Sequence, residues 1–154
     1  MEIRRGEPLV PVATPWFTTA DIGGTGVGQV LSGSMDIGWS NIPENVSDLA
    51  LELRCSAQVL SGTGFASVWF ILYGLTRTLA TAADIGTSEF SRRMIADGTV
   101  REMRMIIPGI SAANGYHSVL SGFAVRAQGK GTAADTEWAM TGIKVRVIYT
   151  PGVM

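Results

Sequence analysis

The feature that most constrains the fold is an alternation of apolar and polar residues within positions 49–59. The odd positions are apolar: Leu49, Leu51, Leu53, Cys55, Ala57 and Val59. The even positions from Glu52 to Gln58 are polar. A period of two places successive side chains on opposite faces of a strand, whereas a helix repeats about every 3.6 residues. The segment therefore predicts a half-buried β-strand whose odd-numbered side chains lie in the core.

The following segment, residues 65–73, is apolar on both faces and is separated from the first strand by the turn sequence Ser61-Gly62-Thr63-Gly64. A strand with two apolar faces must be covered twice. One cover is the core of the domain. For the other cover we expect either the N-terminal segment or another subunit.

The rest of the chain shows further short strands separated by glycine and proline. Residues 27–39 are strand-like but interrupted by Gly33 and Gly38, residues 116–127 form another strand, and residues 128–135 are expected to form a long loop. In the last strand, residues 137–149, the apolar parity changes at Thr141-Gly142, which predicts a β-bulge at Gly142. About seven or eight strands at spacings of about 8–12 residues, with little helix, predict an all-β, antiparallel, jelly-roll-like sandwich.

Residues 88–107 surround an Asp97-Gly98 pair, a preferred two-residue hairpin turn. A hairpin in this register places Arg93 opposite Glu102 and Ile95 opposite Val100. The rival interpretation is a short helix from Ser88 that ends at Gly98. We favour the hairpin.

The N-terminal segment, residues 1–25, differs from the remainder because Pro8, Pro11 and Pro15 interrupt an apolar sequence. Proline fixes φ and removes a hydrogen-bond donor, so this segment is neither a central strand nor a helix interior. We therefore divide the chain into an extended arm, residues 1–25, and a single sandwich domain, residues 26–154. An arm this apolar packs either over its own domain or on a neighbouring subunit.

Charged residues make up 16% of the chain, well below the usual share of about 25%, and the net charge is −1. Such a composition argues against a disordered chain and against a dedicated nucleic-acid binder. The single cysteine argues against a disulfide scaffold. No apolar run approaches the ~20 residues of a membrane span, and no secretory signal core follows the charged N-terminus.

The sequence offers little to catalysis. The glycines between Gly23 and Gly28 do not fit a nucleotide-binding spacing and predict a turn or close packing. His117 is the only histidine, so a histidine-based metal site or catalytic triad lacks a second member. Cys55 lies on the apolar parity of its strand and is expected to be a small buried hydrophobe. We therefore expect no enzyme activity, no metal and no cofactor.

The ten arginines, seven methionines and four tryptophans fit the composition of an interface core, in which lysine and glutamate are depleted. The methionines fit gap-filling in a single core equally well. The candidate interface residues come from the arm and from the strand with two apolar faces: Leu9, Val10, Val12, Trp16, Phe17, Trp69, Ile71 and Tyr73.

The proline-punctuated arm at residues 9–17, the strands over residues 49–73 and the closing strand at residues 142–151 together resemble small structural proteins of tailed-bacteriophage particles, including capsid decoration proteins. This resemblance implies a non-enzymatic virion protein, assembled in the host cytoplasm as a homo-oligomer, often a trimer. It implies packing on other coat or tail subunits, without nucleic acid or membrane. The alternatives are a carbohydrate- or receptor-binding sandwich that uses Trp or Tyr platforms, and an enzyme on a jelly-roll scaffold.

Overall fold

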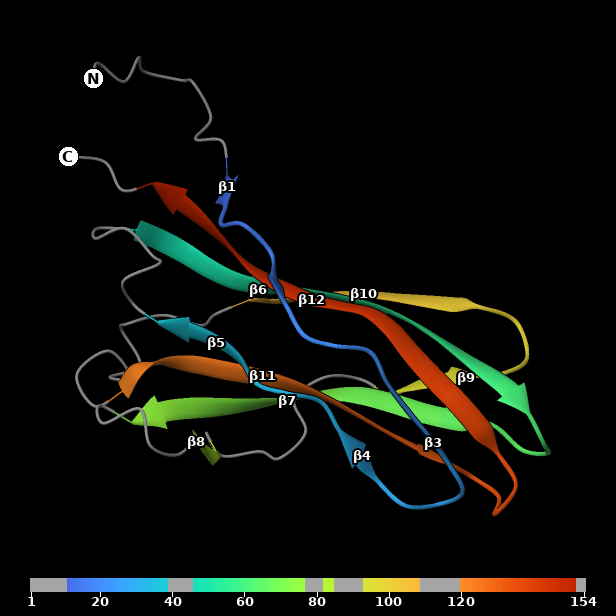
Figure 1. Cartoon of the computed structure of the whole chain (residues 1–154). Coiled ribbons are helices and arrows are strands. Elements are labelled where there is room, and N and C mark those ends of the chain that lie inside the picture. Colours follow the sequence, from blue (N-terminus) through green and yellow to red (C-terminus); the bar gives the residue numbers. More distant parts are fainter. Residues whose placement is uncertain (1–10, 39–45, 77–81, 85–92, 109–119, 152–154) are drawn as a thin grey trace.

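The computed structural model describes residues 11–38, 46–76, 82–84, 93–108 and 120–151. These residues form strands, turns and bends, and none of them forms a helix that could cross a membrane. The strands build two antiparallel sheets that face each other (Figure 1).

Sheet A is built around the long strand β12 (Glu137–Pro151), which pairs along its length with β6 (Val46–Ser61). Strand β10 (Arg101–Pro108) pairs with the far edge of β6. The other edge of β12 carries three short strands in succession: β1 (Val12–Ala13), β2 (Phe17–Thr18) and β3 (Ile22–Thr25).

Sheet B is built around β7 (Ala66–Thr76) and β11 (Leu120–Gly131), which pair along their length. Two short strands, β4 (Val30–Leu31) and β5 (Met35–Gly38), pair with the free edge of β11. Two others, β8 (Ala82–Asp84) and β9 (Met94–Ala96), pair with the free edge of β7.

When short strands that share an edge are counted together, each sheet has four strand positions. The chain crosses from one sheet to the other between β3 and β4, β5 and β6, β6 and β7, β9 and β10, β10 and β11, and β11 and β12. Eight positions in two antiparallel sheets with this winding form a jelly roll. The all-β sandwich expected from the sequence is therefore confirmed.

The core lies between the sheets and follows the predicted parities. On β6 the odd positions from Leu51 to Val59 are buried, and on β7 the even positions from Ala66 to Leu72 join the same cluster. On β12 the buried parity changes from Trp138 and Met140 to Ile143 and Val145. The register shifts there and Gly142 has a φ of 60°, so the predicted bulge is confirmed.

The described part of the N-terminal arm forms the edge of sheet A. Pro15 separates β1 from β2, as expected of a residue that cannot donate to a strand ladder. We considered that the arm packs either over its own domain or on a neighbouring subunit. Its described residues pack on their own domain, because β1, β2 and β3 pair with β12. Residues 1–10 lie outside the described part.

The predicted hairpin around Asp97-Gly98 is wrong. Strand β9 pairs with β7 in sheet B, whereas β10 pairs with β6 in sheet A, so this turn carries the chain between sheets. A hairpin turn of this type needs positive φ at both central residues, and Gly98 does not have it. Instead the Asp97 carboxylate accepts hydrogen bonds from the Thr99 amide at 3.0 Å and from Arg101 at 2.8 Å.

The loop expected at residues 128–135 is shorter than predicted, because β11 continues to Gly131. Glycine is required at position 129, since a Cβ atom there would lie 2.6 Å from the indole of Trp138. What reads as a flexible sequence is thus a strand held close to an aromatic side chain. The glycine sequence at 23–28 divides similarly, into the end of β3 and a turn at Gly26, whose φ is 98°.

Candidate functional site

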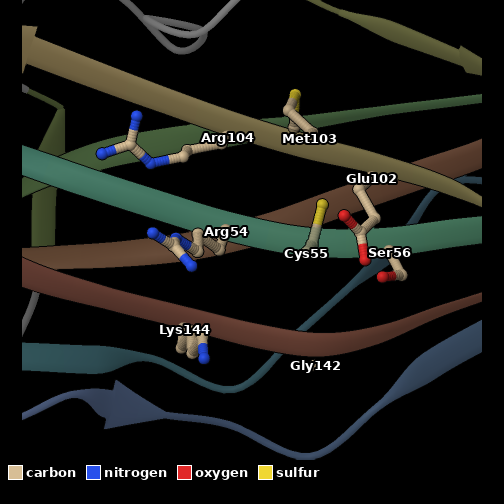
Figure 2. Close-up of a pocket in the computed structure, with 8 residues that line it drawn as sticks. All are labelled: Arg54, Cys55, Ser56, Glu102, Met103, Arg104, Gly142 and Lys144. Carbon is tan, nitrogen blue, oxygen red and sulfur yellow. The ribbon is translucent and has the colours of Figure 1, made fainter.

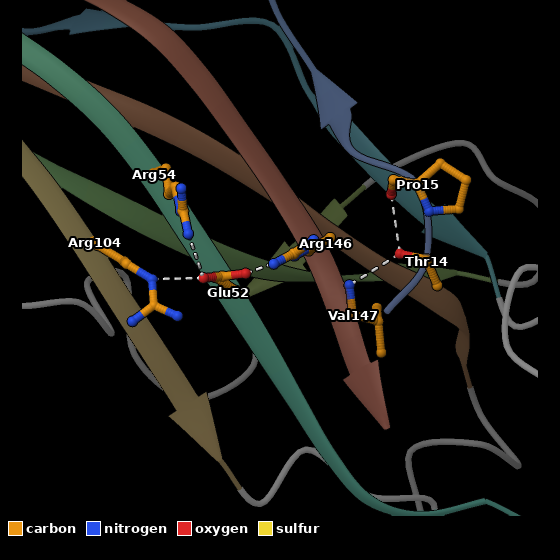
Figure 3. Close-up of polar contacts among 7 residues, drawn as sticks. All are labelled: Thr14, Pro15, Glu52, Arg54, Arg104, Arg146 and Val147. Atoms are coloured by element: carbon orange, nitrogen blue, oxygen red, sulfur yellow. Dashed lines mark hydrogen bonds and ion pairs between the residues drawn. The ribbon is translucent and has the colours of Figure 1, made fainter. Parts of the chain in front are cut away.

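The outer face of sheet A carries a buried carboxylate. Glu52 occupies an even position of β6, which the alternation assigns to the polar face, yet it is 0% exposed. Three arginines surround it: Arg146 Nε donates to Oε1 at 2.5 Å, and Arg104 Nε and Arg54 Nη2 donate to Oε2 at 2.7 and 3.2 Å (Figure 3). These arginines come from three adjacent strands, so Glu52 ties β12, β6 and β10 together.

Glu52 is held in its charged form by these contacts. Burial on its own would raise the pKa of the carboxyl group, because it disfavours the charged state. The hydrogen bonds from Arg146, Arg104 and Arg54 outweigh burial and bring the pKa of Glu52 below its ordinary value. The cluster is therefore an ionic one at neutral pH.

Trp16 from the arm covers this cluster. Its ring lies 4.2 Å from the Arg146 guanidinium, 4.6 Å from Lys144 Nζ and 5.4 Å from the Arg54 guanidinium. Cations over an indole face are attracted by the ring quadrupole. Two of these cations, Arg146 and Arg54, are also partners of the Glu52 carboxylate.

Thr14 anchors the arm next to Trp16. Its amide donates to the Val147 carbonyl at 2.9 Å, and its Oγ1 accepts from the Val147 amide at 3.1 Å and donates to the Pro15 carbonyl at 3.0 Å (Figure 3). Edge-strand pairing thus fixes the arm on β12, immediately before Trp16.

The strand register arranges this face in transverse rows. Arg104 on β10 pairs with Arg54 on β6, which pairs with Lys144 on β12, so three cations stand side by side across the sheet. The row on one side of them contains Glu52 between Ile106 and Arg146. The row on the other side contains Ser56 opposite Glu102 and Thr141.

A pocket of about 260 Å³ opens beside the row of cations. It is lined by Arg54, Cys55, Ser56, Glu102, Met103, Arg104, Gly142 and Lys144. Figure 2 shows Arg54, Arg104 and Lys144 on one side of the pocket and Glu102 with Ser56 on the other. The pocket lies at the bulge, where β12 changes register against β6 and Gly142 contributes no side chain.

The predicted interface residues occupy several environments. Leu9 and Val10 lie outside the described residues, and so does the side chain of Tyr73. Val12 is exposed on edge strand β1, whereas Trp16 and Phe17 are half-buried. The described members of the set are divided between the two sheets, and the role of the set as an interface stays a prediction.

Trp69 and Ile71 lie on the outer face of sheet B but are only 2% and 5% exposed. The chain itself therefore provides their second cover, which we expected from the arm or from another subunit. The Arg93 guanidinium lies 4.0 Å from the Trp69 ring and belongs to that cover. The described arm lies on the opposite sheet.

Of the residues weighed for catalysis, the described ranges include Cys55, which is buried. Burial raises the pKa of the Cys55 thiol to about 12, in keeping with a small buried hydrophobe. His117 lies outside these ranges. Within them, no three His, Cys, Asp or Glu side chains gather as a metal site would require.

The cluster around Glu52 was not foreseen from the sequence. The alternation assigned Glu52 and Arg54 to one face, and the parity of β12 placed Lys144 and Arg146 outward. The predicted hairpin paired residues 99–107 with residues 88–96, so it gave no reason to expect Arg104 beside Arg54 on β6. The one available signal was that a chain with few charges concentrates cations on the outward parities of three strands.

No protein-family model matches the chain, and no curated protein matches it. Two solved structures from infectious bursal disease virus share its fold. The viral particle subunit is similar at a TM-score of 0.56 and 10% identity over 92% of this chain. The Gx strain structure is similar at a TM-score of 0.51 and 8% identity over 99%. The chain spans only 31% and 37% of the length of those viral chains.

A xylan-binding domain, CBM22-1 of Paenibacillus barcinonensis Xyn10C, is similar at a TM-score of 0.43 and 8% identity over 92% of this chain and 95% of that domain. At identities this low, the two viral structures show a likeness of fold alone. The comparisons therefore place the chain among β-sandwich proteins that include subunits of viral particles.

Proposed function

We propose that this protein is a non-enzymatic structural subunit of a virus particle that packs against copies of itself and other coat or tail subunits. Its place among the accessory proteins of tailed bacteriophages is part of this proposal. The observation that carries it is a set of exposed apolar side chains at one end of the jelly roll. The fold shared with infectious bursal disease virus particle subunits supports it.

The apolar end is formed by the connections between the sheets. The turns between β3 and β4, β6 and β7, β9 and β10, and β11 and β12 all lie at the right of Figure 1. At this end Val27, Leu60, Phe65 and Val100 are each between 52% and 61% exposed. Large apolar side chains at neighbouring exposed positions are typical of surfaces that bind another protein.

The experiment is solution mass by light scattering on the full chain and on a Leu60→Ser/Phe65→Ser variant. We expect the full chain to form a defined oligomer and the variant to be smaller. The matched control is Leu31→Ser, an exposed apolar residue on the edge of sheet B, which should leave the mass unchanged. A monomeric full chain, or a variant that assembles as well as the control, would overturn the proposal.

The arm is tested separately by removing residues 1–10, which leaves every described strand pairing in place. Removing residues 1–20 would be a poor test, because it also removes β1, β2 and Trp16 from sheet A. If the arm contributes to assembly, the chain lacking residues 1–10 should have a lower mass while its thermal unfolding is unchanged. An unchanged mass would remove the arm from the proposed interface.

The alternative is carbohydrate binding, for which we expected Trp or Tyr side chains to act as stacking platforms. A stacking platform needs an exposed aromatic face. Trp69 and Trp138 are buried, and the half-buried Trp16 has cations against its ring. Phe65 is 52% exposed, but it lies at the apolar end that we assign to assembly.

A further inference from the structure

We infer that the pocket at the Gly142 bulge binds a carboxylate group, held by Arg54, Arg104 and Lys144. This inference does not rest on the proposed function, because the pocket lies within one chain. It begins with the row of three cations on β10, β6 and β12. Like charges directly opposite each other on neighbouring strands are destabilising, so such a row needs anions nearby.

Among the described residues, one carboxylate forms ion pairs with this group, and it does not balance the cations. Glu52 neutralises one charge, yet it is shared among Arg54, Arg104 and Arg146. Lys144 contacts the Trp16 ring. Arg54 Nε is buried and has no hydrogen-bond partner, so the donors of the cluster are not saturated. Among the described residues, four cations stand against the buried Glu52 and, across the pocket, Glu102, which leaves an excess of two positive charges.

The pocket lies on the side of this row away from Glu52. The register places Glu52 two positions before Arg54 on β6, and Ser56 two positions after it. Because the pocket is lined by Arg54, Arg104, Lys144 and Ser56 but not by Glu52, a ligand there meets the cations from their open side (Figure 2).

The opposite wall of the pocket selects the kind of anion. Glu102 faces the cations across the pocket, and its negative charge disfavours a second charge on the ligand. A carboxylate carries one charge and matches the planar fork of arginine, whereas a phosphate group carries up to two. Ser56 offers a neutral hydroxyl to an adjacent polar group. The pocket therefore suits a carboxylate better than a phosphate.

The two lysines of the chain make a direct test possible. In protein labelled with ¹⁵N-lysine, the amide spectrum contains one signal from Lys144 in the pocket and one from Lys130 on sheet B. Lys130→Arg assigns them. During titration with sodium acetate at constant ionic strength, we expect the Lys144 signal to shift and saturate, with a dissociation constant in the millimolar range. The Lys130 signal should stay in place.

Substitutions on β10 decide whether the pocket is responsible. Arg104→Gln should weaken acetate binding about tenfold, because it removes a charged hydrogen-bond donor. Arg101→Gln removes the same charge three residues away, outside the pocket, and should change the affinity less than about twofold. If the two variants behave alike, if both lysines shift together, or if neither shifts, the inference is wrong.

The preference for a carboxylate is tested with inorganic phosphate. The unmodified protein should bind acetate more tightly than phosphate, and Glu102→Gln should improve phosphate binding more than acetate binding. Tighter phosphate binding by the unmodified protein would overturn the assignment to a carboxylate. Titrations with glucuronate and with N-acetylglutamate amide then distinguish an acidic sugar from an acidic side chain as the source of the group.

Discussion

The two outer faces of the sandwich differ in what they bury and in how they cover it. On sheet A the buried group is the carboxylate of Glu52, covered by arginines that still reach water and by the half-buried Trp16. On sheet B the buried groups are Trp69 and Ile71, and the cation over Trp69 is Arg93. An ionic cluster lies on one face and an apolar one on the other.

This difference separates two ways of stabilising the outside of a jelly roll. Burial of apolar surface is non-directional and does not depend on protonation. A buried carboxylate contributes only while it is charged and while every partner is in place. The face of sheet A should therefore respond to pH and to single charge changes, and the face of sheet B should respond to the loss of volume.

The largest effect is expected on sheet B. Trp69→Ala should lower the free energy of unfolding by about 3–5 kcal/mol, because it removes a large side chain that is 2% exposed. Urea denaturation followed by circular dichroism measures this loss. Trp69→Phe keeps an aromatic ring and should cost clearly less. A loss below ~1 kcal/mol for alanine would show that this face is loosely packed.

Glu52→Gln should have the next largest effect, lowering the free energy of unfolding by about 3 kcal/mol. The physical reason is that three arginines lose the charge that they share, although their contact with water softens the loss. Glu102→Gln is the matched control, since Glu102 is exposed on the same face. It should change stability by less than about 0.5 kcal/mol. Equal losses of stability for the two substitutions would show that the buried ion pairs of Glu52 do not stabilise the fold more than an exposed carboxylate does.

The pH dependence should follow Glu52 as well. Its pKa in the folded protein lies below its ordinary value, so the unfolded chain binds this proton more readily. Its contribution is therefore complete above the unfolded pKa of about 4.3, and it is lost as the pH falls further toward the folded pKa. The unfolding free energy of the unmodified protein should fall more steeply below pH ~5 than that of Glu52→Gln. Parallel curves would contradict an ionic cluster.

The sequence predicted those parts of the fold that depend on local alternation. The core parity of β6, the two apolar faces of β7 and the bulge at Gly142 can each be read from a few neighbouring residues. The turn at Asp97-Gly98 could not be predicted from neighbouring residues, because an Asp-Gly pair suits both a hairpin and a crossover between sheets. What decides between them is whether β10 pairs with β9 or with β6, and that is a long-range contact.

The site was beyond prediction for the same reason. The row of Arg104, Arg54 and Lys144 joins three strands that are far apart in the sequence, and a one-residue change of register would disperse it. The burial of Glu52 depends in addition on the arm, whose tryptophan closes over the cluster. The sequence could predict that each of these polar residues lies on the outer face, but it could not predict which of them lie together.

Trp16→Ala should have a smaller effect, about 2 kcal/mol, because the half-buried ring gains about 0.5–1 kcal/mol from each well-placed cation. The variant also exposes Glu52 to water, so its pH dependence should become shallower. Trp16→Phe keeps an aromatic ring that attracts cations less strongly, so its stability should lie between that of the unmodified protein and that of Trp16→Ala. An equal loss in the free energy of unfolding for Trp16→Ala and Trp69→Ala would contradict the comparison, because both outer faces would then depend equally on burying an aromatic side chain.

The smallest effect concerns the bulge that opens the pocket on sheet A. Gly142 has a φ of 60°, and a Cβ atom built there would meet nothing within 4 Å, so Gly142→Ala carries a backbone cost without a clash. That cost should be about 1 kcal/mol, measured by urea denaturation. Gly142→Asn should cost less, because asparagine tolerates the left-handed region better than alanine does. If alanine and asparagine cost the same, the left-handed backbone at position 142 is not what the substitutions disturb, and the origin of the pocket in the bulge would have to be abandoned.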